Sequence, residues 1–184
     1  MKKREFLKSA CAGVCSCVGL TTFTSGAVLS QEKNDPNPEV ERLKREMKFV
    51  HNRMAILIEL ISSDISIEQK QKLFKNLGRA CSTEYMQGRF QNDLDGFLIH
   101  YKEIWAEDVV HDKENKTVTI IGRQTDNCAC PLADKSVTPA DFCDCSLGFL
   151  IGTFEQINGS QIQAALKESI LRGGKRCSFT IMYS

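Results

Sequence analysis

The stretch that decides the fold is residues 145–184, CSLGFLIGTFEQINGSQIQAALKESILRGGKRCSFTIMYS. Its first part repeats apolar residues at helical spacing and stops at Asn158-Gly159: Leu147, Leu150, Ile151 and Phe154. Its last part alternates apolar and polar residues, as a β-strand with one buried face does: Cys177, Phe179 and Ile181. We therefore expect a helix and then a final hairpin that turns at Gly173-Gly174.

Upstream of this stretch, the sequence favours helices first and a hairpin second. A helix is expected from Pro38, with one apolar stripe made of Val40, Leu43, Met47, Val50, Met54, Leu57 and Ile61. His51 lies beside that stripe and is expected to be a partly exposed histidine without a special role. Ser66 and Gln69 form a capping box for a second helix, whose buried face is predicted to contain Ile67, Leu73, Phe74 and Leu77.

A third short helix fits residues 93–106, and the period then changes. Residues 106–123 indicate two strands around the charged turn DKENK. The order is helices, hairpin, helix, hairpin. This order predicts an α+β fold in which an antiparallel sheet is packed by helices.

Length and composition agree with one folded domain. The chain has 184 residues, of which 42% are hydrophobic and 26% charged. The formal net charge is +1, so we expect no nucleic-acid partner.

Residues 1–30 are typical of an export signal, because a basic start precedes an uncharged run of small residues. The segment KREFLK resembles the twin-arginine motif, with Lys3 at the place of the first arginine. The run is too polar for a membrane span. A lipid attachment at Cys17 and a frayed cytosolic terminus are the alternatives. We expect residues 31–38 to be a linker, residues 39–184 to form a single cysteine-rich α+β domain, and the protein to reach the bacterial periplasm or cell envelope.

Two C-x-C pairs, Cys128/Cys130 and Cys143/Cys145, carry the strongest chemical indication. Six cysteines remain after residue 30: these four, Cys81 and Cys177. Zinc prefers four ligands and commonly takes thiolates, so two loop pairs and one strand cysteine could form its shell. An even number of cysteines in an exported chain also fits three disulfides. A chain of this length, however, can bury a core without them.

A catalytic thiol is the third interpretation. It would need a lowered pKa and a nearby base. Cys145 lies at the expected start of a helix, where the helix dipole would favour the thiolate. Cys81 lies near Glu84, although a small buried hydrophobic residue is the simpler interpretation of it. Glu168 should come close to Cys177 across the last hairpin, as a ligand, as a partner of a ligand or as an ordinary strand residue.

Residues 142–184 resemble the C-terminal half of the 4-vinyl-reductase-type small-molecule-binding domain. The matching features are Cys145, Gly148, Gly152, Glu168, Gly173 and Cys177-Ser178-Phe179. The same stretch is similar to L-2-amino-thiazoline-4-carboxylate hydrolase-like families of bacteria. There, C-x-C-P and F-C-x-C-S segments precede the hairpin, as Cys128–Pro131 and Phe142–Ser146 do here, and the segment GRACS is shared.

This resemblance covers about Cys81 to Phe179 and implies an α+β domain whose cysteines hold zinc near a ligand cavity. Five cysteines would compete for four positions, with Cys130, Cys145 and Cys177 first and Cys128 or Cys143 completing the shell. The leading interpretation is an exported domain that binds zinc and a small-molecule ligand. A metal- or cysteine-dependent hydrolase of a small thiazoline or cyclic amide and a disulfide-stabilised envelope protein are the alternatives. The sequence leaves open whether the chain is an enzyme.

Overall fold

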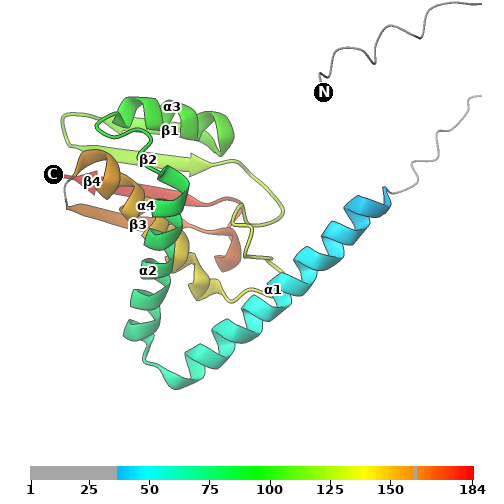
Figure 1. Ribbon diagram of the computed structural model, residues 1–184. Helices are drawn as coiled ribbons and strands as arrows, with labels where there is room; N and C mark the ends of the chain where they lie inside the picture. Colours follow the sequence, from blue (N-terminus) through cyan, green and yellow to red (C-terminus); the bar gives the residue numbers. More distant parts are fainter. Residues whose placement is uncertain (1–36, 160) are drawn as a thin grey trace, which may run out of the picture. The chain divides into compact units, whose positions relative to one another are not determined.

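The structure is a computed structural model that describes residues 37–159 and 161–184. The predicted export signal and most of the predicted linker lie outside these residues. The helices are α1 (Pro38–Asp64), α2 (Ile67–Met86), α3 (Leu94–Ile104) and α4 (Cys143–Asn158), with short 3-10 turns η1 (Ala140–Phe142) and η2 (Ile170–Arg172). The strands are β1 (Ala106–Asp112), β2 (Thr117–Gly122), β3 (Ile162–Glu168) and β4 (Ser178–Tyr183) (Figure 1). Within the described residues, no helix combines the length and apolarity needed to cross a membrane.

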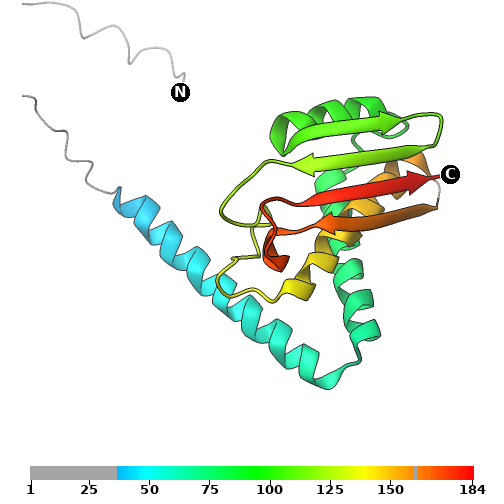
Figure 2. The same cartoon turned by 180° about the vertical axis from the view of Figure 1, so that it is seen from behind.

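The four strands form one antiparallel sheet in the order β1-β2-β4-β3, which confirms the predicted α+β fold (Figure 2). The central pair β2 and β4 aligns Val118 with Ile181 and Ile120 with Phe179. These four side chains are at most 2% exposed and point to one face of the sheet. Helix α4 covers that face, so its apolar side chains and those of the sheet form the main core.

Helices α2 and α4 pack backbone against backbone, because glycines occupy the contact. A Cβ added to Gly78 of α2 would lie 1.9 Å from the carbonyl oxygen of Cys145. A Cβ added to Gly148 of α4 would lie 2.1 Å from the carbonyl oxygen of Lys75. This contact fixes the first turn of α4, and with it Cys143 and Cys145, against the middle of α2.

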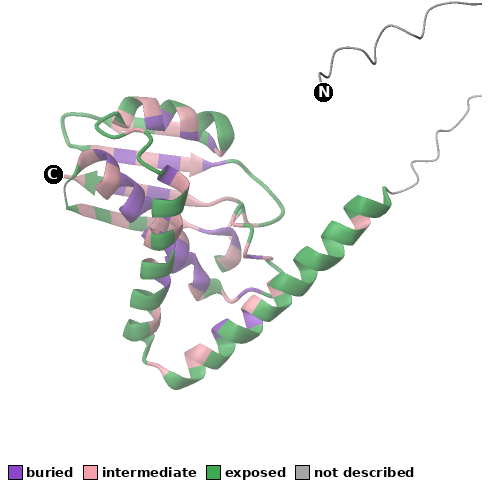
Figure 3. Cartoon of the chain, viewed as in Figure 1, coloured by how far each residue is buried: buried purple, intermediate pink, exposed green. Residues whose placement is uncertain are grey.

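Most of α1 is exposed (Figure 3), and the rest of the described chain covers only part of its apolar stripe. Val40, Leu43, Met47, Val50 and Leu57 are 40–49% exposed. Met54 and Ile61 are partly buried, and Ala55 and Ile58, beside the stripe, are buried. The capping box of α2 is confirmed, but part of its predicted buried face is wrong. Phe74 is buried, whereas Ile67 is 73% exposed and Leu73 and Leu77 are also exposed. The reason is that α2 buries its glycine face against α4, a face that an apolar pattern does not mark.

The last connection differs from the predicted tight hairpin. The segment between β3 and β4 contains η2, and Gly173 ends that turn with φ of 89°. Cys177 lies just before β4, although its carbonyl oxygen still accepts a hydrogen bond from the Gly122 backbone at 2.8 Å. Cys177 therefore stays beside the end of β2, where the cysteine-rich loop begins.

Candidate functional site

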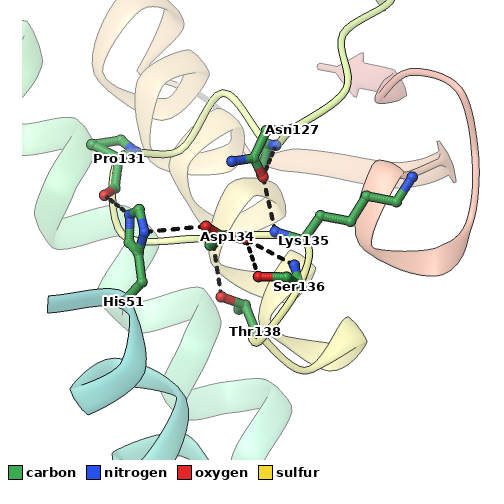
Figure 4. A network of polar contacts seen from close by, with 8 residues as sticks. His51, Asn127, Pro131, Asp134, Lys135, Ser136 and Thr138 are labelled. Atoms are coloured by element: carbon green, nitrogen blue, oxygen red, sulfur yellow. Dashed lines mark hydrogen bonds and ion pairs between the residues drawn. The ribbon is translucent and has the colours of Figure 1, made fainter. Parts of the chain in front are cut away.

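The loop between β2 and η1, residues 123–139, carries the first cysteine pair and is held by polar side chains (Figure 4). The Asn127 side-chain oxygen accepts hydrogen bonds from the backbone N–H groups of Cys128 at 2.9 Å and Lys135 at 2.8 Å. The Thr138 hydroxyl accepts one from the Asp134 backbone at 2.9 Å. These bonds close the loop on itself and set the position of Cys128 without help from regular structure.

His51 of α1 fastens this loop to the helix, so the prediction that it has no special role is wrong. Its Nε2 donates to the carbonyl oxygen of Pro131 at 2.9 Å, and its Nδ1 lies 3.6 Å from a carboxylate oxygen of Asp134 (Figure 4). His51 is partly exposed, as predicted. Ile58 and Met54 of α1 pack beside residues of the same loop. No apolar pattern indicates this role, because it depends on a loop 80 residues away.

All six described cysteines are free thiols. They lie near one another, on the loop of residues 123–139, on α2, in the first turn of α4 and just before β4. Cys143 and Cys145 are buried in the first turn of α4, and the other four are partly buried. Cys145 belongs to a small apolar cluster with Ile58, Phe74 and Phe142, on which Cys128 and Cys130 also pack. The structure therefore brings the loop pair and Cys145 to the same cluster.

The buried thiols are close enough to influence one another's pKa values. The thiols that act most strongly on Cys145 are Cys130 and Cys81. Those that act on Cys177 are Cys128 and Cys143. Cys145 is also influenced by Cys128 and Cys143, and Cys130 by Cys128, so the thiols form one cluster.

Burial raises the pKa values of four thiols, Cys130, Cys143, Cys145 and Cys177. It raises the pKa of Cys145 to about 12, and the neighbouring thiols add to the shift. It raises the pKa of Cys177 to about 11 and also raises the pKa values of Cys130 and Cys143. The expectation that the start of α4 would favour a Cys145 thiolate is therefore wrong, because loss of solvent outweighs the helix dipole.

Thiols are suitable donors for zinc, but in this arrangement they do not form a ligand shell. Across residues 37–159 and 161–184, no three His, Cys, Asp or Glu side chains are placed to hold a metal ion. One thiol has a polar partner instead, since the sulfur of Cys143 lies 2.7 Å from the hydroxyl oxygen of Ser169. Glu168 accepts a hydrogen bond from the Lys175 backbone at 2.8 Å, so its carboxylate helps to hold the connection between β3 and β4.

The three histidines are engaged away from the thiols. His51 contacts the loop backbone, His100 lies 3.2 Å from the Tyr85 hydroxyl, and His111 bridges Asp95 and Tyr183. A cysteine nucleophile needs a base within hydrogen-bonding distance. These contacts supply no such pair.

Two hollows border the thiols. One has a volume of about 240 Å³ and is lined by Ile104, Trp105, Arg123, Thr125, Ala129, Ile170 and Cys177. Ala129 separates the two cysteines of the loop pair, so the loop forms one wall and Cys177 another. A wider, open hollow of about 540 Å³ is lined by Cys81, Glu84, Tyr85, Gln87 and Arg89. We call the first hollow the Trp105 pocket.

Comparisons with known proteins relate this chain to others through its fold. No protein-family model and no curated protein sequence matches it. Trafficking protein particle complex subunit 3 from Naegleria fowleri, covalently bound to palmitic acid, has a TM-score of 0.50 and 15% identity, over 77% of this chain and 96% of that one. The phenol-responsive sensory domain of the transcription activator PoxR with phenol has a TM-score of 0.45 and 11% identity, over 71% and 73% of the two chains.

A vinyl-4-reductase family protein from Methanocaldococcus jannaschii has a TM-score of 0.39 and 11% identity, over 80% of this chain and 94% of that one. At such low identities a likeness concerns the fold alone. The chain therefore shares its fold with the Naegleria subunit.

Proposed function

We propose that this chain binds a small, partly apolar molecule in the Trp105 pocket, beside a thiolate zinc site. The observation that carries the proposal is that one loop segment contributes both to the pocket and to the thiol cluster. Ala129 lines the pocket, and its two neighbours in sequence, Cys128 and Cys130, belong to the thiol cluster. A ligand in the pocket and an ion on the thiols would therefore act on the same loop. The resemblance of Cys145–Phe179 to 4-vinyl-reductase-type binding domains supports this proposal.

The size and lining of the pocket define the ligand. Ligand pockets usually measure about 300–1,000 Å³, and this one, at about 240 Å³, suits a molecule near the size of one aromatic ring. Ile104, Trp105 and Ile170 supply apolar walls. The guanidinium of Arg123 supplies a positive charge at the rim, and it is held there by the carbonyl oxygens of Lys102 and Glu103 at 3.2 and 2.8 Å. A small aromatic carboxylate fits this combination.

Trp105 is the only tryptophan of the chain, so its fluorescence reports directly on the pocket. Titration with benzoate should change the emission and saturate, and the uncharged analogue benzamide should bind at least about tenfold more weakly if Arg123 takes part. Arg123→Gln should remove the preference, whereas Arg89→Gln, in the other hollow, should keep it. No saturable change with either probe would refute the proposed pocket.

For zinc, we propose Cys128, Cys143 and Cys177 as ligands, because Cys177 also lines the pocket. The side chains would have to rotate to converge, and a water or a pocket ligand would complete the tetrahedron. Elemental analysis of protein purified without chelator should then give about one zinc per chain. Cys143→Ser and Cys177→Ser should lower this content, and Cys81→Ser should leave it unchanged. Metal-free protein from every preparation would refute the site.

We also propose export, on the basic start and uncharged run of residues 1–30. Fractionation of bacterial cells should place the chain in the periplasm or envelope, and Arg4→Gln should retain it in the cytoplasm. Retention of the unaltered chain in the cytoplasm would contradict the proposal. We prefer binding to a cysteine-dependent hydrolase, because the described histidines contact groups other than the thiols.

A further inference from the structure

The seven residues of the α1 stripe follow a heptad pattern. Their spacing alternates between three and four residues throughout: Val40, Leu43, Met47, Val50, Met54, Leu57 and Ile61. In heptad notation Val40, Met47, Met54 and Ile61 occupy a positions, and the other three occupy d positions. This spacing over three heptads is typical of helices that pair along a seam, rather than of helices that lie on a globular core.

Within the described chain, five of the seven seam residues are exposed, and the other two, Met54 and Ile61, are partly buried. Leu43 is 47% exposed and Leu57 is 49% exposed. The side of α1 that contacts its own domain borders the seam, with His51, Ala55 and Ile58 toward the cysteine-rich loop and the small cluster. It takes in one seam residue, Met54, which packs on that cluster. Residues 42–50 are exposed without exception. An isolated helix of about a dozen residues is marginal in water, so this half of α1 lacks the packing that would stabilise it.

We propose that α1 pairs with α1 of a second copy of this chain, as a parallel two-stranded coiled coil. The residue types favour this arrangement. β-Branched residues stand at the first and last a positions, Val40 and Ile61, and leucine stands at two of the three d positions, a choice that favours parallel dimers.

Charge complementarity supports the same partner. In a parallel pair, a residue at g faces the following e position of the other helix. This places Glu39 beside Lys44 of the partner subunit, once on each side of the seam. Within one chain these side chains form only exposed ion pairs, Glu39 with Arg42 at 2.6 Å and Lys44 with Glu41 at 2.8 Å. Such pairs contribute little and can exchange partners.

The charge of α1 argues against an anionic membrane as the occupant. Pro38–Asp64 contains five acidic and five basic residues, so the helix has no net charge. A helix that lies on an anionic membrane carries an excess of Lys and Arg on its polar face.

The test is the mass of the full chain in solution at micromolar concentration, by sedimentation equilibrium. We expect a monomer–dimer equilibrium that reaches twice 20.6 kDa. Leu57→Glu should weaken dimerisation about tenfold or more, since it places charges in the seam. Ile56→Glu is the matched control, because Ile56 is its neighbour, is 46% exposed and lies at a c position away from the seam. Leu43→Glu, far from the domain body, repeats the test where folding is not at risk.

A charge exchange tests the parallel orientation. Glu39→Lys and Lys44→Glu should each weaken the dimer, and the double variant should restore it. A monomer at all concentrations, equal effects of Leu57→Glu and Ile56→Glu, or no recovery in the double variant would overturn the proposal. So would binding of a monomer to vesicles of phosphatidylcholine and phosphatidylglycerol.

Discussion

The contact between α2 and α4 makes a sharp prediction for Gly148→Ala. The added methyl group would lie 2.1 Å from the carbonyl oxygen of Lys75, more than 1 Å closer than an ordinary contact of 3.4 Å. Two backbones meet at this point, so no side chain can rotate away. The helices must separate, and every side chain packed between α4 and the sheet is affected.

The magnitude follows from two opposing effects. Alanine is better than glycine in a helix interior by about 1 kcal/mol. Overpacking of a well-packed contact costs roughly 1–3 kcal/mol, and contacts that cannot yield lie at the upper end. We therefore expect a net loss of about 2 kcal/mol, which for a domain of this size lowers Tm by about 4–8 °C.

Thermal unfolding followed by circular dichroism measures this change. Ala80→Gly is the matched control, because Ala80 is exposed on α2 and the substitution isolates the helix-propensity effect. It should cost about 1 kcal/mol. If Gly148→Ala kept or raised Tm, the higher helix propensity of alanine would be the only effect on stability. The close approach of α2 and α4 would then be wrong.

Three further predictions concern the site. Gly122→Ala places a methyl group 2.7 Å from the indole of Trp105, so it should shift the tryptophan emission and destabilise the fold by about 1–3 kcal/mol in urea titrations; an unchanged spectrum would contradict the packing. His51→Ala should cost about 1 kcal/mol and speed hydrogen exchange in residues 131–138, whereas exchange at the wild-type rate would show that His51 does not hold the loop. In metal-free protein, the free energy of unfolding should fall as pH rises above about 8.5, the pKa of an unfolded thiol, because the unfolded chain then loses protons that the folded chain keeps. The fall should extend toward the raised pKa values of Cys177, about 11, and Cys145, about 12, and urea midpoints that stay constant over this range would refute the shifts.

The secondary structure could be predicted because local patterns determine most of it. The periodicity of Leu147–Phe154 and the alternation of Phe179 and Ile181 survive in α4 and β4. The capping box of Ser66 and Gln69 also forms. The partner against which a helix or strand packs is not determined by its local sequence. An apolar stripe indicates that a helix has an apolar partner, but it does not indicate whether that partner belongs to the same chain. The glycines that allow α2 to contact α4 do not form an apolar pattern in the sequence.

In the thiol cluster, sequence spacing likewise does not determine the direction in which each cysteine side chain points. The sequence offered Cys128, Cys130, Cys143, Cys145 and Cys177 as candidates for one shell. On a helix, however, residues two apart point in different directions, and α4 begins at Cys143 rather than at Cys145. Cys143 accordingly meets Ser169, while Cys145 enters the apolar cluster of Phe74 and Phe142.

One ion could therefore take both helix cysteines only if the first turn of α4 unwound. That turn lies against Gly78, where no side chain can give way. A single zinc ion should accordingly use Cys143 or Cys145 but not both. Cys143 is the helix cysteine that influences Cys177, and Cys177 lines the Trp105 pocket.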